Sequence, residues 1–316
     1  MLVLKSLLLI LGFFILIKGA DFFVDGASSL AKNFRMSTMF IGLTIVAFGT
    51  SAPEFAVSLS SILTKNQDMV LGNVIGSNIL NILLILGIAS LVHPLSVKNN
   101  TVKKELPIVL LLTMLLIVLI SDNLFSLGNN MFTRQDGIII LLFFTVFIYY
   151  LISMIRNKVD KNEEKPKFGL VKSIILSIFG IIGIVLGSNL VVNNASSIAS
   201  ILGISQRMIS LTIVAFGTSL PELVTSVMAV KKGEYDIAIG NVVGSNIFNI
   251  GIVLALPVAL FGGINHIVFN YIDLIMILLS AVFLFIFSFK DKKINKYEGV
   301  FMLLLFTIYY SYVIFG

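Results

Sequence analysis

Cysteine is absent from the 316 residues, so the chain carries no disulfide and no thiolate metal site. Histidine is almost absent too: His93 and His266 are the two present, and both lie near the ends of apolar segments, where we expect an interfacial role. Charged residues make up 12% of the chain, hydrophobic residues 58%, and the mean hydropathy is +1.05. A soluble domain is excluded, because apolar stretches of about 18 or more residues recur along the whole length.

Ten hydrophobic segments can be marked, and they predict an all-α polytopic membrane protein. They span residues 3–26, 37–63, 69–93, 106–121, 136–155, 171–195, 206–230, 237–262, 270–289 and 297–315.

An internal repeat relates the two halves of the chain. A shift of 168 residues superposes ASSLA (27–31) on ASSIA (195–199), and GNVIGSNILNI (72–82) on GNVVGSNIFNI (240–250). The first apolar segment therefore has a counterpart, which argues against a cleaved signal peptide.

Each half holds five segments, and because five is odd, the two copies must enter the membrane from opposite sides. The fold class predicted is ten transmembrane helices in two inverted five-helix repeats, an architecture characteristic of secondary transporters. Residues 1–155 form the first repeat, 156–170 a polar cytoplasmic linker and 171–316 the second repeat.

The net charge is +6, and the distribution of the basic residues indicates which loops lie in the cytoplasm. With the N-terminus outside, seventeen lysines and arginines fall in cytoplasmic connections, against four on the opposite face: Lys5, Lys65, Arg134 and Arg207. This bias predicts a multi-pass protein of the cytoplasmic (inner) membrane with both termini outside. The basic composition needs no nucleic-acid partner.

Two copies of one motif place a glutamate inside an apolar segment: IVAFGTSAPEF (45–55) with Glu54 and IVAFGTSLPEL (213–223) with Glu222. An ionised acid at mid-bilayer costs about 2.5–3.5 kcal/mol, so two of them need compensation. A protonated glutamate in a structural hydrogen bond, or a polar clamp between helices, is the plainer interpretation of each. Neither accounts for the matched oxygen-rich surroundings of both.

Helical spacing predicts those surroundings. The first copy brings Ala47, Thr50 and Ser51 to the face of Glu54, and the second brings Ala215, Thr218 and Ser219 to that of Glu222.

Proline and a neighbouring segment add further oxygens. Pro53 and Pro221 each remove an amide, which frees the carbonyls of Gly49 and Gly217. The next segment repeats polar residues at four-residue steps: Asn73, Ser77 and Asn81, matched by Asn241, Ser245 and Asn249. A polar face that only binds helices together is the alternative.

Hydroxyl, amide, carbonyl and carboxylate oxygens are hard ligands that suit calcium, and sodium accepts the same types. A site able to hold either one calcium or several sodium ions would couple the two fluxes by competition. Transition metals are disfavoured, since cysteine and histidine ligands are lacking.

The paired GTSAPE and GTSLPE motifs, with GNVIGSNILN and GNVVGSNIFN, resemble the alpha repeats of the calcium/cation antiporter superfamily, in particular prokaryotic sodium/calcium exchangers. The resemblance covers essentially the whole chain and implies alternating access, with calcium exchanged for sodium. It also implies a ligand set with Glu54 and Glu222 as the principal calcium ligands. The remaining members are oxygens of Thr50, Ser51, Thr218, Ser219, Ser77, Ser245, Asn81 and Asn249 and the carbonyls of Ala47 and Ala215.

The chain departs from the family pattern at one position that affects the charge of the expected ion site. Some exchangers of that family carry aspartate where this chain has Asn249, so the site here has two clear acids. The charge count predicts that exchange is closer to electroneutral here than in relatives with that aspartate. It leaves the sodium stoichiometry, potassium dependence and proton coupling open. The repeat aligns Asp21 with Asn189 and Asp25 with Asn193. We expect the two aspartates to have an interfacial role.

Other functions remain open. A calcium/proton or potassium-dependent antiporter fits the same residues, and a cation channel could also use buried acids. An enzyme is disfavoured, because no H-E-x-x-H run or serine or cysteine nucleophile paired with histidine occurs. The predicted partners are calcium, sodium and the lipid bilayer, with no cofactor, and a monomer is sufficient.

Small residues in the first and sixth segments predict movement. Gly12 and Gly19 match Gly180 and Gly187, and glycine lets a helix slide against a neighbour at close approach. As the resemblance implies, we expect these two helices to gate access by moving past a comparatively static core.

Overall fold

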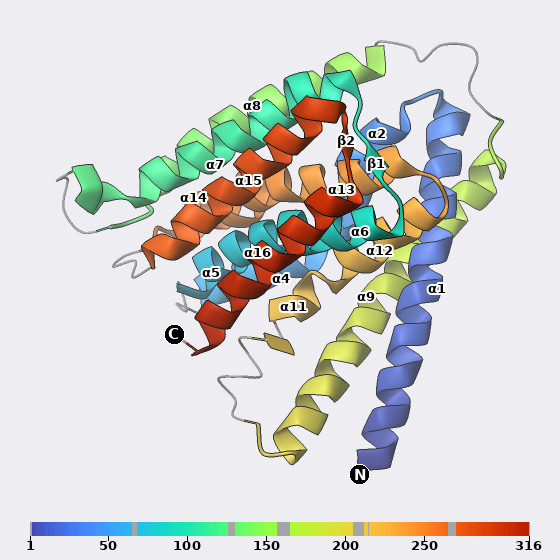
Figure 1. Cartoon of the computed structure of the whole chain (residues 1–316), viewed down its shortest axis with the longest axis horizontal. Helices are drawn as coiled ribbons and strands as arrows, with labels where there is room; N and C mark the ends of the chain where they lie inside the picture. Colours follow the sequence, from blue (N-terminus) through green and yellow to red (C-terminus); the bar gives the residue numbers. More distant parts are fainter. Residues whose placement is uncertain are drawn as a thin grey trace.

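The computed structural model describes residues 2–64, 68–125, 130–156, 165–204, 212–213, 215–264 and 270–315. Helices make up nearly all of this part of the chain (Figure 1). Each hydrophobic segment expected from the sequence overlaps a helix, although residues 206–211 and 214 of the 206–230 segment lie outside the described residues.

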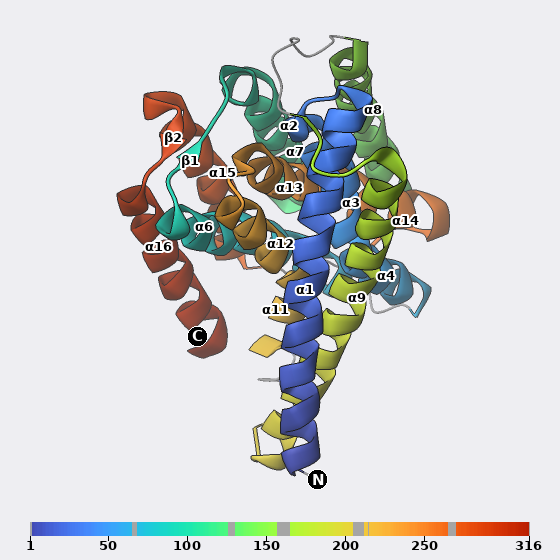
Figure 2. The same ribbon diagram turned by 90° about the vertical axis from the view of Figure 1, so that its right-hand side faces the viewer.

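The two longest helices, α1 (Leu2–Phe34) and α9 (Leu170–Ile201), pack side by side and extend away from the remaining helices (Figures 1 and 2). Glycines make this contact close. A Cβ added at Gly187 would lie 2.5 Å from the amide nitrogen of Leu16, and one at Gly180 would lie 2.6 Å from the Cα of Phe23. The repeated glycines are therefore needed where α1 and α9 touch each other.

Two helical segments form the centre. The first runs through α5 (Asp68–Leu80), η2 (Asn81–Leu86) and α6 (Gly87–Val92). The second runs through α13 (Tyr235–Phe248), η6 (Asn249–Leu254) and α14 (Ala255–Phe261). In each, 78% of the most apolar window is buried, against 33% in α1. Each contains a π-helical stretch that begins at an asparagine, and such stretches often mark functional sites.

A broken helix lies beside each central segment. In the first half it comprises α2 (Thr38–Ile41), η1 (Gly42–Val46), α3 (Ala47–Thr50) and α4 (Ala52–Leu63), with a bend of 47° at Ser51. In the second half α11 (Ala215–Thr218) and α12 (Leu220–Lys231) meet at Ser219. Pro53 and Pro221 fall in the first turn that follows each break, where the missing amide is tolerated.

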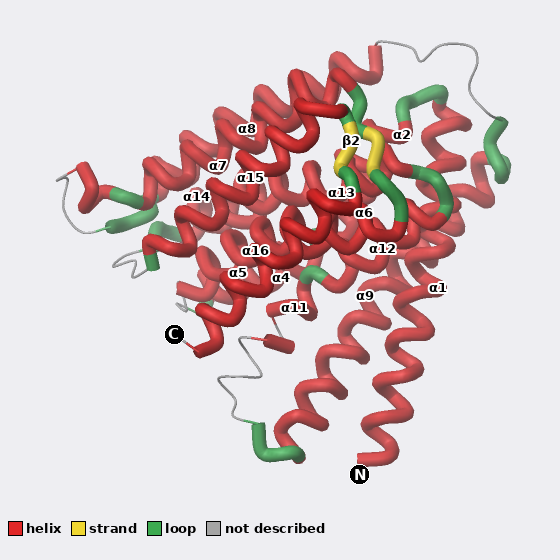
Figure 3. The backbone as a smooth tube through the Cα atoms, viewed as in Figure 1, coloured by secondary structure: helices red, strands yellow, loops and turns green. Residues whose placement is uncertain are grey.

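Outer helices cover this arrangement: η3 (Thr101–Glu105), α7 (Leu106–Ile120), η4 (Asp122–Phe125), α8 (Arg134–Arg156), α15 (Tyr271–Asp291) and α16 (Lys296–Phe315). The all-α expectation missed one detail. The short strand β1 (Leu95–Ser96) pairs antiparallel with β2 (Lys293–Ile294), drawn in yellow in Figure 3. This pairing joins the loop after α6 to the loop before α16.

Seven helices among the described residues are long and apolar enough to cross a membrane, or eight if the bent pair 38–63 is one span. The chain is a multi-pass membrane protein, as its composition predicts.

Candidate ion-binding site

Glu54 and Glu222 occupy equivalent places, in the first turn of α4 and of α12 directly after each break. Their exposed fractions are 1% and 0%. A helix start directs backbone N–H groups and the positive end of the helix dipole toward such a carboxylate. The breaks thus place both acids inside the protein, where the helix starts partly stabilise their negative charge.

The two halves exchange hydrogen bonds at these acids. The Ser51 hydroxyl donates to Oε1 of Glu222 at 3.0 Å, and the Ser219 hydroxyl donates to Oε1 of Glu54 at 3.3 Å. Ser219 also lies 3.4 Å from the hydroxyl of Ser77. Each glutamate is therefore oriented by the serine of the other half, so hydrogen bonds link these residues of the two halves.

Asn73 and Asn241 hold the helix starts in place. The Asn73 amide donates to the Glu54 carbonyl at 3.2 Å, and the Asn241 amide donates to the Glu222 carbonyl at 3.3 Å. Thr50 in turn donates to Oδ1 of Asn241 at 2.9 Å. These contacts give both asparagines, and Thr50, a positioning role.

Two further hydrogen bonds pair four asparagines, each bond between one asparagine of the first half and one of the second. Asn81 donates to Oδ1 of Asn246 at 3.2 Å, and Asn249 donates to Oδ1 of Asn78 at 3.0 Å. Sequence reasoning missed Asn78 and Asn246, although both follow the serine in the repeated GSN. Asn246 and Asn78 each accept from an amide nitrogen, of Asn81 and of Asn249. The Oδ1 atoms of Asn81 and Asn249 therefore point away from these two hydrogen bonds.

Among the described candidate site residues, four buried acceptor oxygens have no hydrogen-bond donor: Oε2 of Glu54, Oε2 of Glu222, Oδ1 of Asn81 and Oδ1 of Asn249. Each such group costs about 1–3 kcal/mol if nothing binds it. A cation would satisfy all four acceptors together, and hard oxygen donors with two carboxylates match calcium or sodium. No cluster of three His, Cys, Asp or Glu side chains occurs within the described ranges.

Two carbonyls already accept hydrogen bonds: that of Ala47, an expected ligand, and that of Gly217, which Pro221 was expected to free. The Ala47 carbonyl accepts from the Ser51 amide at 3.0 Å and from the Thr50 hydroxyl at 3.3 Å. The Gly217 carbonyl accepts from Ser188 of α9 at 2.9 Å.

The last two expected ligands lie in α11. It holds the backbone of Ala215, whose side chain is outside the described residues, and a half-buried Thr218.

Asp21 and Asp25 of α1 form ion pairs away from this site. Lys232 lies 2.6 Å from Asp21 and 2.8 Å from Asp25, and Lys167 lies 2.9 Å from Asp25. The hydrogen bond to the Asp25 carboxylate raises the pKa of Lys167, because it stabilises the charged ammonium. These contacts tie α1 to the turn after α12 and to the segment before α9.

Paired acids at the breaks of two discontinuous helices, inside a bundle of apolar helices, define a membrane transport protein. The sodium/calcium exchanger protein family matches the chain over residues 4–153 and 172–315. The chain belongs to this family, whose members are transporters and not enzymes.

Individual relatives match along nearly the whole chain. It is 32% identical over 350 residues to the sodium/calcium exchanger MaX1 of Methanosarcina acetivorans, covering 100% of this chain and 99% of that protein. It is 36% identical over 291 residues to the inner membrane protein YrbG of Escherichia coli, covering 89% and 87%. The solved structure of the sodium-calcium exchanger NCX_Mj, soaked with zero Na+ and Ca2+, matches with a TM-score of 0.84 at 34% identity, covering 99% of this chain and 100% of that one.

Proposed function

We propose that the chain exchanges calcium for sodium across the membrane by alternating access, with Glu54 and Glu222 as the principal ligands of one shared site. The observation that carries the proposal is the set of four donor-free acceptor oxygens, two from each half, buried between the broken helices. Family membership and the name of MaX1 support the identity of the ions.

The site explains the coupling by charge. Two ionised glutamates place about two negative charges in a low-dielectric interior, which one calcium or two sodium ions would balance. Because the same oxygens would serve both ions, calcium and sodium exclude each other. The wider expected set adds oxygens from Thr50, Ser51, Thr218, Ser219, Ser77, Ser245, Asn81 and Asn249 and from the backbone of Ala47 and Ala215.

The membrane arrangement is part of the proposal. Ten crossings form two inverted five-helix repeats, 1–155 and 171–316, joined by the linker 156–170. The matched motifs and the equivalent hydrogen bonds of Asn73 and Asn241 support this division. The distribution of basic residues supports the inner membrane with both termini outside; the name of YrbG agrees with the inner membrane.

Access is controlled by α1 and α9. The two helices touch through glycines, so they move as a pair past the central segments α5–α6 and α13–α14, which are the most buried. Movement of the pair exposes the glutamates to one side of the membrane at a time.

Calcium uptake into sodium-loaded proteoliposomes tests the proposal. Sodium, potassium or protons are supplied in turn as the only counter-ion, and uptake is expected with sodium. Uptake with protons or only with potassium present would identify one of the other antiporters. Uptake that needs no ion on the opposite side would identify a channel and overturn the proposal.

A further inference from the structure

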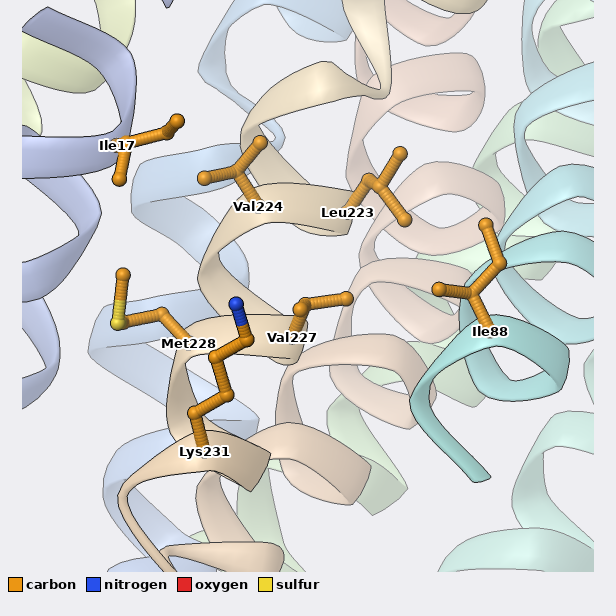
Figure 4. A pocket seen from close by; sticks show the side chains of 7 residues that line it. All are labelled: Ile17, Ile88, Leu223, Val224, Val227, Met228 and Lys231. Atoms are coloured by element: carbon orange, nitrogen blue, oxygen red, sulfur yellow. The ribbon is translucent and has the colours of Figure 1, made fainter. Parts of the chain in front are cut away.

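An apolar groove of about 280 Å³ lies on α12, between α1 and α6, outside the ion site. It is far larger than the roughly 30 Å³ of one liquid water molecule. Six of its lining residues are apolar and the seventh is a lysine: Ile17, Ile88, Leu223, Val224, Val227, Met228 and Lys231 (Figure 4). Apolar walls of this size favour a hydrocarbon occupant over water.

Lys231 is the polar feature of the groove, and its ammonium points along α12 between Met228 and Val227 (Figure 4). Within the described part of the chain, Lys231 makes no ion pair, in contrast to Lys232, which is held by Asp21 and Asp25.

The other acids near this end of α12 already have partners. Glu234 pairs with Lys32 at 3.6 Å, and Asp236 pairs with Lys98 at 2.5 Å. Lys231 is exposed, so its ammonium can bind an anion from outside the protein.

The length of the groove sets what that anion can be. Leu223 and Lys231 are eight residues apart on one helix, which corresponds to about 12 Å. Half of the hydrocarbon core of a bilayer measures about 15 Å. The groove therefore reaches from a charged helix end to Leu223, the residue next to Glu222, which is the span of one acyl chain.

We propose that this groove binds an anionic phospholipid, with the phosphate on Lys231 and one acyl chain along Val224 and Val227 against Ile17 of α1. The lipid occupies the seam between α1 and the helix that carries Glu222. The repeat supports a dedicated site on this half, because the residue equivalent to Lys231 is Leu63.

Lipid retention measured by native mass spectrometry tests the proposal without reference to transport. The full chain is released from nanodiscs that contain equal amounts of dioleoyl phosphatidylglycerol and dioleoyl phosphatidylcholine. The wild type is expected to retain phosphatidylglycerol preferentially. Lys231→Gln should lower that preference about fivefold, since one basic residue near an anionic surface contributes about that factor. Equal retention of the two lipids by the wild type would overturn the proposal.

Two further variants distinguish lipid binding in the groove from a general effect of the protein's positive charge. Lys290→Gln removes one positive charge from the exposed end of α15 and should keep the wild-type preference. Val227→Phe fills the groove and should reduce retention of the phosphatidylglycerol while Lys231 is intact. An equal loss of preference in Lys290→Gln, or undiminished retention in Val227→Phe, would contradict the assignment.

Discussion

The two halves of the chain carry the same residues at the proposed ion site, but the contacts around those residues differ. Asp21 and Asp25 on α1 are tied to Lys232, whereas the equivalent residues on α9 are Asn189 and Asn193. Ser188 of α9 donates to the Gly217 carbonyl, whereas the equivalent residue on α1 is Ala20.

This difference separates two physical requirements. In the proposed exchange mechanism, an ion that approaches from either side must meet the same ligands, which fits the repetition of the inner residues. The outer contacts are free to differ, and they hold α1 and α9 to the core in unlike ways. We infer that the site residues determine whether ions bind, and that the unlike contacts bias which side the site faces.

The largest effect is expected at the residues that the halves share. Glu54→Gln or Glu222→Gln should each lower calcium exchange at least about 100-fold, beyond the roughly 10–100-fold typical of residues one shell further from a metal. An amide lacks the charge that calcium requires. The measurement is calcium uptake into sodium-loaded proteoliposomes.

Glu105→Gln is the matched control for these variants. Glu105 is also fully buried and accepts a hydrogen bond from Tyr150, which an amide oxygen can still accept, but it lies in η3, outside the proposed ion site. Exchange should persist in Glu105→Gln. Near-normal exchange in Glu54→Gln or Glu222→Gln would remove the core of the account.

Rigid attachment of α1 to the core should also stop exchange. The chain has no cysteine, so Asp21→Cys with Lys232→Cys gives a unique thiol pair where an ion pair of 2.6 Å now lies. Joining the thiols with a short reducible crosslinker should abolish turnover, and reduction should restore it. The unlinked double variant supplies the reference rate. Unchanged turnover after complete linkage would exclude movement of α1 past α12.

A moderate effect is expected at the contact that only the second half has. Ser188→Ala leaves the buried Gly217 carbonyl without its side-chain donor, which should cost about 1–3 kcal/mol of folded-state stability. A lower thermal unfolding midpoint of the purified protein is the readout. Ser197→Ala, which removes only an exposed bond to Asn193 on the same helix, should leave the midpoint unchanged. Equal midpoints for both variants would show that Ser188 does not secure the break.

The smallest effect is expected from added charge. Asn249→Asp adds a negative charge beside the glutamates and removes the bond to Asn78. We expect exchange by the unmodified protein to be closer to electroneutral than in relatives with the extra aspartate, and the variant to become more voltage-sensitive. Calcium flux is measured against a potassium-diffusion potential set with valinomycin. Strong voltage dependence in the unmodified protein that Asn249→Asp leaves unchanged would show that charge at this position does not set the stoichiometry.

The helices and the shared residues could be predicted because apolar runs and repeated motifs are local properties of a sequence. The hydrogen-bond partners of those residues could not be predicted from the sequence. SAPE and SLPE match a capping box, in which Ser51 or Ser219 would cap its own helix. Neither serine does so, and each hydroxyl reaches the glutamate of the other half.

The ion pairs of α1 could not be predicted from the sequence either. Asp25 is far from Lys232 along the chain, and nothing in the pattern around either residue names the other. The Ser188 contact with Gly217 has the same cause, because it depends on how α9 packs against α11. The interfacial role expected for Asp21 and Asp25 stays a prediction.

Equilibrium binding of radioactive calcium to the purified protein in sodium-free buffer tests the central claim, a single site shared by both halves. The account predicts one calcium ion per wild-type chain and loss of that binding in Glu54→Gln and in Glu222→Gln alike. Two calcium ions per wild-type chain, with one retained in each single variant, would show that each half holds its own site and would contradict the account.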